Sequence, residues 1–243
     1  MTGLETTGTF VLPGGASVLF TTKADGNMSS VGGTDAQDGA GNRERLRLRL
    51  GLAALARGYQ VHGSAVQIVT APGQDPPDND SLAHADGQVT CLEGVGVTVL
   101  SADCLPIAVA GEGSVGVLHA GWRGLAAGVL EATLAALGGA GDELIAWLGP
   151  AIGPAHYEVG EEVRTAFCRR DARAAAAFAA NARGRWQCDL HRLARQRLTA
   201  LGVQSIHAEA RCTYAQPESF YSFRRDGVTG RMGALIWFEG QAR

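Results

Sequence analysis

Cysteine and aromatic residues are scarce in this sequence, and neither sign of charge dominates. The five cysteines form no CxxC pair and are widely scattered, which suggests neither a disulfide framework nor a zinc ribbon. The formal net charge of -3 leaves no basic excess, so nucleic acid and anionic membranes are not expected as general partners. Small molecules are the expected partners, and a reducing cytoplasm is the expected compartment.

Long uninterrupted hydrophobic runs are also missing. No stretch approaches membrane-spanning length without a charge or a glycine, and the first residues lack the basic start and apolar run of a signal peptide. What is present is a hydrophobic content of 46%, enough for a sizeable core. We therefore expect one cytoplasmic domain over residues 1–243, with no membrane contact.

Hydrophobic periodicity and turn residues predict a strand-rich mixed fold. A segment rich in Gly, Asp, Ser and Asn at 23–41 is predicted to be a flexible loop. Helices are predicted at about 41–57, 124–137, 161–168, 172–182 and 189–201, and strands within 9–22, 65–69, 95–100, 105–110, 115–120, 144–148, 203–208 and 232–238.

The chain is organised around a predicted hairpin that brings Cys104 near His119. A two-residue loop at 111–112 places Cys104 directly opposite His119, whereas a four-residue loop at 111–114 places it diagonally, on the same sheet face. A thiol beside an imidazole suggests either two metal ligands or a Cys/His nucleophile pair. The non-functional alternative is a buried cysteine and a hydrogen-bonded histidine in the core. Asp103, adjacent in sequence, is predicted to point away from His119.

Three further residues have both a functional and an ordinary explanation. Arg43 falls in the first turn of a predicted helix, where the helix dipole disfavours a cation, so it is either solvated or held for an anionic or polar ligand. His62, two residues after Gln60, is either ordinary strand-edge chemistry or part of a site. Arg123 precedes a predicted helix whose free N–H groups would suit phosphate.

Several motifs together resemble the family long described as laccase-domain or multicopper polyphenol oxidases, more recently regarded as purine nucleoside enzymes. They are QVHG at 60–63, ADCLP at 102–106, HAGWRG at 119–124, LGPAIG at 148–153, YEVG at 157–160 and YSFRRDG at 221–227. The resemblance implies an α+β fold of four layers, α/β/β/α, with mixed sheets, related to the CNF-toxin-like cysteine hydrolases. It also implies that His62, Cys104 and His119 are the catalytic ligands of one Zn²⁺, and that Arg43 and Gln60 line a nucleoside pocket.

The activity implied by this resemblance is phosphorolysis of adenosine, inosine, guanosine and methylthioadenosine, together with hydrolytic deamination of adenosine. Purine nucleosides and phosphate are then the partners of a monomer or homodimer, with Arg123 as a candidate phosphate ligand. Two imidazoles and a thiolate suit a catalytic zinc with an open position.

Two other chemistries stay open. A copper-dependent polyphenol oxidase would need on the order of ten imidazole ligands for its copper cluster, and the chain has six histidines, although one copper ion could occupy the same three ligands in vitro. A metal-free hydrolase would use Cys104 as nucleophile and His119 as base, which would leave His62 without a role.

Overall fold

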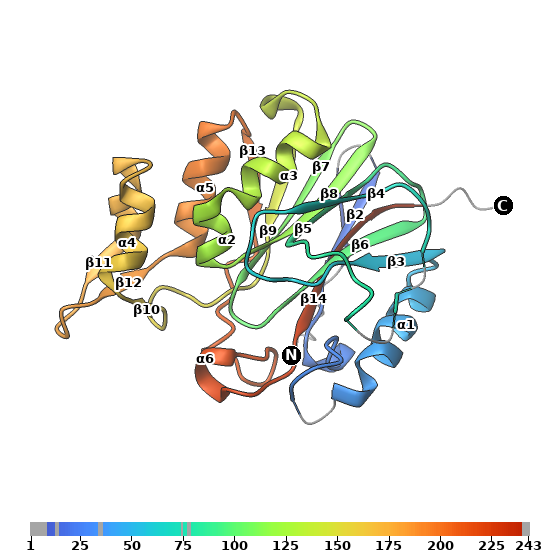
Figure 1. Cartoon of the computed structure of the whole chain (residues 1–243), viewed down its shortest axis with the longest axis horizontal. Helices are drawn as coiled ribbons and strands as arrows, with labels where there is room; N and C mark the ends of the chain where they lie inside the picture. Colours follow the sequence, from blue (N-terminus) through green and yellow to red (C-terminus); the bar gives the residue numbers. More distant parts are fainter. Residues whose placement is uncertain (1–8, 13–14, 34–35, 74, 77–78, 240–243) are drawn as a thin grey trace, which may run out of the picture.

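Two β-sheets lie face to face between helices in this structure, a computed structural model (Figure 1). It describes residues 9–12, 15–33, 36–73, 75–76 and 79–239. The first sheet has five strands, of which only the β3–β6 pair is parallel. Their order is β1 (Phe10–Val11), β2 (Ala16–Phe20), β14 (Met232–Phe238), β6 (Val95–Ser101) and β3 (Ala54–Arg57).

The second sheet has six strands and carries the central hairpin. Its two edge pairs are parallel and its inner pairs are antiparallel. The order is β13 (Ser205–Ala208), β9 (Ile145–Leu148), β7 (Leu105–Gly111), β8 (Ser114–Ala120), β5 (Gly87–Thr90) and β4 (Val66–Val69). A small third sheet contains β10 (Glu158–Val159), β12 (Trp186–Cys188) and β11 (Phe178–Ala180).

Three apolar clusters separate four layers. Val97 and Ile236 of the first sheet pack on Val117 of the second, forming the core between the sheets. Leu46 of α1 (Gly39–Arg49) packs with Trp237 on the outer face of the first sheet. The outer face of the second sheet is covered by α2 (Trp122–Ala127), α3 (Val129–Leu137) and α5 (Leu190–Ala200). In Figure 1, α4 (Glu161–Cys168) lies at the left end and α6 (Phe223–Asp226) at the lower edge.

The mixed α+β architecture is therefore as predicted, and several elements match closely. The helix predicted at 161–168 is α4, and the strand predicted at 232–238 is β14. Asp189 accepts a hydrogen bond from the backbone N–H of Arg192 at 2.9 Å and so begins α5 as its N-cap.

Three predicted helices need correction. The first ends at Arg49, and residues 54–57 form β3 because the chain reverses at Gly51, with φ 67°, and pairs in parallel with β6. The second begins at Trp122 and is interrupted at Gly128, whose φ is 103°. The alanine-rich third one is a 3₁₀ helix (Ala172–Ala177) followed by β11, because pairing with β12 overrides alanine's helix propensity.

The segment 23–41 is less exposed than its composition predicts. It contains two short 3₁₀ helices (Lys23–Asp25 and Ala36–Asp38). Met28 is buried against the first sheet, and the buried Asn27 accepts a hydrogen bond from the backbone of Arg231. The segment thus contributes to the core, and its mobility stays a prediction.

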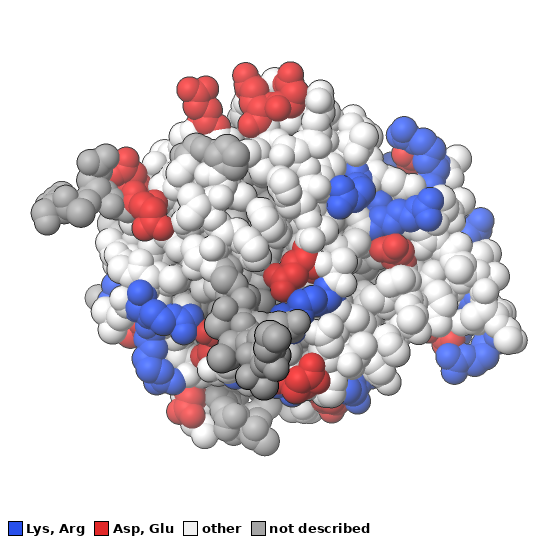
Figure 2. Space-filling model, turned by 180° about the vertical axis from the view of Figure 1, so that it is seen from behind, with Lys and Arg blue, Asp and Glu red and all other residues white. Residues whose placement is uncertain are grey.

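The surface charge is mixed. Seen from behind, Lys and Arg form several small groups separated by acidic side chains (Figure 2). Within the described ranges, no helix is both long and apolar enough to cross a membrane.

Candidate metal centre and its cavity

The β7–β8 hairpin fixes the relation between Cys104 and His119. Gly111 pairs with Ser114, so the turn consists of Glu112 and Gly113, with φ 69° at the glycine. Pro106 consequently lies opposite His119, and Cys104 lies diagonal to it. The diagonal register is confirmed, whereas the register with glycine first in the turn is wrong because the left-handed position is the second one.

Three potential ligands from distant parts of the chain converge at the end of this hairpin. The ligand atoms of His62, Cys104 and His119 all lie within 4.8 Å of one another, and Cys104 Sγ is 3.9 Å from His62 Nε2. A tetrahedral zinc with bond lengths of ~2.3 Å to sulfur and ~2.1 Å to nitrogen would set its ligand atoms about 3.3–3.6 Å apart. The ligand atoms would therefore need to close by at most about 1.5 Å to share one ion.

Gly121 makes room for this convergence. A Cβ atom at this position would lie 3.0 Å from Cys104 Sγ and 3.0 Å from His62 Cδ2. Its φ of -62° is one that any residue can adopt. Glycine is therefore needed here for space beside the ligands and not for backbone conformation.

A single buried carboxylate, Asp86, holds two of the three ligands. Its Oδ1 lies 2.8 Å from His119 Nδ1, which fixes the tautomer and leaves Nε2 facing the other ligands. The same carboxylate accepts hydrogen bonds from the backbone N–H groups of Val61, His62 and Gly63 at 2.8–3.0 Å. Asp86 has no exposed surface, so both ligands are positioned from inside the fold.

Backbone strain is concentrated at the ligands. Among the described residues, His62 with φ 59° and Asp103 with φ 91° are the only non-glycine residues with positive φ. The Asp103 carboxylate accepts hydrogen bonds from Thr213 Oγ1 at 2.6 Å and from the backbone N–H of Arg224 at 2.7 Å. Asp103 is therefore occupied elsewhere and does not orient His119, as predicted.

The thiol and imidazole form a charged pair in the absence of metal. Burial disfavours charge on the Cys104 thiol, but His119 and then His62 outweigh it and lower the pKa of Cys104 to about 6. Burial likewise opposes charge on His119, but Cys104 and Asp86 raise its pKa to about 9. The pair is thus a thiolate beside an imidazolium near neutral pH.

A cavity of about 490 Å³ opens beside the triad. His62 is exposed on this side, whereas His119 is buried. The volume is that of an ordinary small-molecule pocket. Aromatic rings from four segments contribute to its wall, namely Tyr59, Trp122, Tyr157 and Phe223.

The predicted substrate-binding residues are placed differently from one another. Arg123 lines the cavity and lies over the Trp122 ring. Gln60 also lines it, but its amide is paired with the backbone of Leu100 through two hydrogen bonds of 2.7 Å. Gln60 therefore also ties the segment before His62 to β6.

Arg43 does not line this cavity. Its side chain is buried, forms an ion pair with Asp75, and donates to the carbonyl of Met28 at 2.6 Å and to Ser30 Oγ at 3.3 Å. Ser30 itself lines the cavity, so Arg43 lies behind the wall. Arg43 is therefore neither solvated nor directed at a ligand, so both interpretations of the sequence need correction.

Sequence reasoning missed four residues of the site. Asp86 sits in an Ala-Asp-Gly run just before β5, where an acidic residue entering a buried strand is a usable signal. Tyr157, Arg224 and Arg231 line the cavity. Tyr157 and Arg224 belong to two of the motifs shared with the family, YEVG and YSFRRDG, but no role was predicted for either residue from the sequence. Arg231 carries no motif signal.

The remaining histidines do not form a second metal site. All six histidines are described, and the triad is the only metal-competent group found among the described residues. His191 Nε2 lies 3.0 Å from the Gly149 carbonyl, and His156 and His207 stack on Tyr214 and Trp147. A multicopper cluster has no support within this part of the chain.

Comparisons with known proteins identify a family and several relatives. The family described as multi-copper polyphenol oxidoreductase laccase matches residues 11–239. A protein of Pseudomonas aeruginosa named purine nucleoside phosphorylase is 47% identical over 183 residues, covering 74% of this chain and 72% of that protein. The Escherichia coli purine nucleoside phosphorylase YfiH is 43% identical over 180 residues, covering 73% and 71%.

Solved structures give the same relationship. A Neisseria meningitidis protein aligns with a TM-score of 0.87 at 35% identity, covering 96% of this chain and 98% of that one. YlmD from Geobacillus stearothermophilus aligns with a TM-score of 0.84 at 32% identity, covering 94% of each. The chain thus belongs to the multi-copper polyphenol oxidoreductase laccase family, whose relatives here include proteins named purine nucleoside phosphorylase.

Proposed function

We propose that this chain is a zinc-dependent purine nucleoside phosphorylase whose metal is held by His62, Cys104 and His119. The observation that carries the proposal is the convergence of two imidazoles and a thiolate at the wall of a cavity lined by aromatic rings. The names of the relatives supply the reaction class. A relation of the fold to CNF-toxin-like hydrolases stays a prediction.

The donor set fits zinc well. Two imidazoles and one thiolate are the kind of three-residue ligand set that holds a catalytic zinc, and His62 is the exposed member of the set. A zinc ion held there would supply Lewis-acid chemistry, and copper could take the same ligands in vitro. Asp86 keeps His119 in the tautomer that the ion requires.

The cavity wall suits a purine. Aromatic faces such as those of Tyr59 and Phe223 can stack on a planar base, and their partial exposure leaves the mouth open to a nucleoside. Breaking the bond between base and ribose builds positive charge on the sugar, so a phosphate held against that carbon both attacks and stabilises. Arg123 is the candidate for holding the phosphate, and Gln60 is a candidate for contacting the base.

We extend the proposal to adenosine, inosine, guanosine and methylthioadenosine as phosphorolysis substrates, and to hydrolytic deamination of adenosine at the same metal. A monomer or homodimer in the cytoplasm, without nucleic acid or membrane partners, completes it. The substrate-binding role predicted for Arg43 now acts through Ser30 of the cavity wall.

Product identification and metal analysis on one sample test this proposal. Purified protein is incubated with adenosine or inosine, with and without phosphate, and its metal content is determined. We expect one zinc per chain and free base formed only with phosphate. Cys104→Ala and His62→Ala should lose both metal and turnover while Cys91→Ala, at an exposed cysteine, keeps them. Phosphorolysis by metal-free protein would contradict the zinc role.

One observation favours a second candidate, a metal-free Cys/His hydrolase. The lowered pKa of Cys104, held against burial by His119 and His62, makes a thiolate nucleophile available near neutral pH. Alkylation of Cys104 distinguishes the two functions. A metal-bound thiolate is protected until a chelator removes the ion, whereas a metal-free nucleophile reacts at once and the activity is lost as the thiol is alkylated.

A further inference from the structure

The cavity beside the triad is strongly cationic although the whole chain is slightly acidic. Four arginines line it, and Asp103 is the only carboxylate among the lining residues. Arg57 forms an ion pair with Asp75, which also pairs with Arg43, and is hydrogen-bonded to Asn79. The other three arginines are Arg123 of α2, Arg224 of α6 and Arg231, which directly precedes β14.

None of these three guanidinium groups has a carboxylate partner within the described part of the chain. Arg123 stacks on Trp122, and Arg224 lies over the Tyr157 ring and donates to the Glu158 carbonyl at 3.0 Å. Arg231 donates only to the carbonyls of Thr229 and Gly230, at 2.7 and 3.0 Å. A stacked or backbone-bonded guanidinium keeps further N–H groups for another acceptor.

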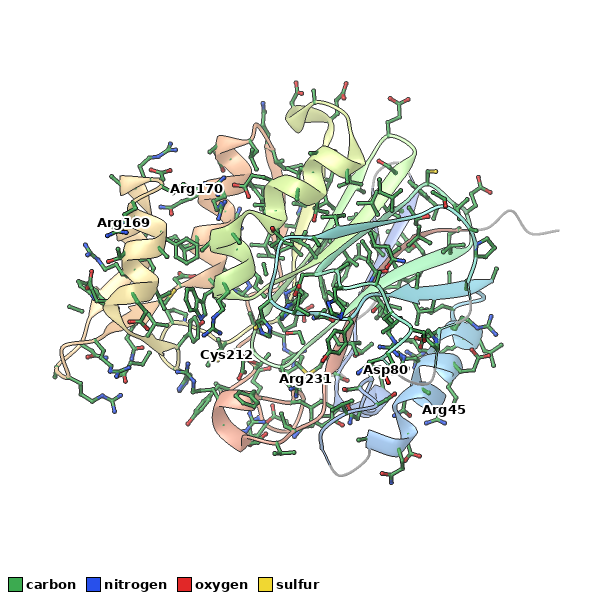
Figure 3. The ribbon with its side chains drawn as sticks, in the orientation of Figure 1. Arg45, Asp80, Arg169, Arg170, Cys212 and Arg231 are labelled. Atoms are coloured by element: carbon green, nitrogen blue, oxygen red, sulfur yellow. The ribbon has the colours of Figure 1, made fainter. Side chains whose placement is uncertain are left out.

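The fold brings Arg224 and Arg231 to the residues around Cys104. The backbone N–H of Arg224 is bonded to the Asp103 carboxylate, one residue before the thiol. Met232, next to Arg231, pairs with Ser101, whose hydroxyl donates to the Cys104 carbonyl. Figure 3 shows Arg231 at the start of β14, beside α6.

Electrostatics agree with this placement. Burial lowers the pKa of Arg231, and the negative charges of Cys104 and then Asp103 oppose that effect. The single carboxylate in the wall, Asp103, is already engaged by Thr213 and Arg224. The cavity therefore offers unmatched positive charge and donors to an anion.

We propose that Arg224 and Arg231, together with Arg123, form a subsite for a phosphate dianion next to the metal ligands. This rests on the proposed function, and it adds to Arg123 two arginines for which no role was predicted from the sequence. Guanidinium groups bind phosphate through paired N–H donors, which fix its orientation as well as its charge.

The reaction served by this subsite is balanced by its own components. An oxygen of hydrogen phosphate forms a bond to C1′ of the ribose while the bond from C1′ to the purine nitrogen breaks. The electron pair of that bond leaves with the purine, and the proton of hydrogen phosphate ends on a purine nitrogen. Ribose 1-phosphate and the free base are the products.

A phosphate group can arrive as inorganic phosphate or as the 5′-phosphate of a nucleotide, and calorimetry separates the two. Inorganic phosphate and adenosine monophosphate are titrated separately into the metal-loaded protein. Arg224→Gln and Arg231→Gln should each raise the dissociation constant for the bound species about tenfold or more, because each removes a charge-assisted contact. Adenosine binding should not change.

Controls keep the test clear of folding effects. Arg169→Gln removes an exposed arginine of the same charge outside the cavity and should leave phosphate binding as in the wild type. Arg231→Lys keeps the positive charge but loses the paired N–H donors. Its affinity for phosphate should lie between that of the wild type and that of Arg231→Gln, provided that circular dichroism shows Arg231→Gln to be folded. Should Arg231→Gln unfold, Arg224→Gln and Arg231→Lys decide the matter.

The outcomes distinguish the subsite from the reaction. Weakened inorganic phosphate binding in the cavity variants, with phosphate-dependent turnover in the wild type, supports both. Binding of the nucleotide alone, lost in the same variants, supports the subsite and contradicts phosphorolysis. Equal phosphate binding by wild type and variants, or no binding of either ligand, overturns the subsite even if phosphorolysis is observed.

Discussion

Replacing Asp86 by asparagine should weaken the metal site and the fold together. The carboxylate accepts four hydrogen bonds, three from the backbone of residues 61–63 and one from His119. An asparagine amide has one oxygen with two lone pairs, so at most two of the four bonds survive, and its NH₂ group faces donors. The His119 tautomer and the His62 turn cannot both be kept.

The magnitude follows from the bonds lost. Two hydrogen bonds to a charged acceptor contribute about 1.5–3 kcal/mol each, so the free energy of unfolding should fall by about 3 kcal/mol or more. Loss of a partner that orients a metal ligand typically lowers metal affinity about 10- to 100-fold. Chemical unfolding of chelator-treated protein and competition with a chromophoric chelator measure the two effects.

Acid unfolding adds a signature of its own. Although burial opposes it, the bonds from His119, Gly63 and Val61 hold the pKa of Asp86 below its usual value. The contribution of Asp86 to the free energy of unfolding is therefore fully present above the pKa of Asp86 in the unfolded state. It is lost as the pH falls through the lower pKa of Asp86 in the folded state. Asp86→Asn should not show this loss, and Asp142→Asn, at an exposed residue, should behave as wild type. Wild-type stability and metal affinity in Asp86→Asn would refute the reasoning.

Three further changes test the site. Gly121→Ala should lower zinc affinity at least tenfold with little change in melting temperature, because the added methyl group displaces the Cys104 and His62 ligands rather than straining the backbone. Arg43→Ala should lose about 2 kcal/mol of unfolding free energy, since it removes one of the two arginines paired with Asp75 and the buried donor to the Met28 carbonyl, and equal stability to wild type in denaturant would contradict this. In metal-free protein, alkylation of Cys104 followed by mass spectrometry should rise with a midpoint near pH 6 and level off by pH 8, whereas a midpoint near 9 would show an ordinary thiol.

Local patterns predicted the hairpin and the layers well. The apolar runs on either side of a glycine-containing turn were enough to place Cys104 and His119 on one face, and capping by Asp189 located α5. The turn could not be settled by counting, because both Gly111 and Gly113 could have supplied its left-handed residue. The strand β3 was missed because its alanines and leucine fit a continuation of the preceding helix, whereas the chain reverses before them, at Gly51.

Residues whose importance depends on tertiary contacts could not be predicted in the same way. Asp86 acquires its role from a turn 23 to 25 residues earlier and a histidine 33 residues later. Arg43 appeared suited to a ligand because its helix position was known and its partner Asp75 was not. The ligand set itself was implied by family likeness, since nothing local to His62 ties it to Cys104.

The positive φ angles at His62 and Asp103 bear on any effort to make this protein more heat-resistant. A design procedure that chose, for each pair of backbone angles, the residue with the least conformational strain would place glycine at both positions. The product would have a relaxed backbone at both positions, but it would lack one imidazole donor and the carboxylate that anchors Thr213 and Arg224 beside the thiol. Thermostabilised versions should therefore leave these two positions untouched and seek their gains in the outer helices.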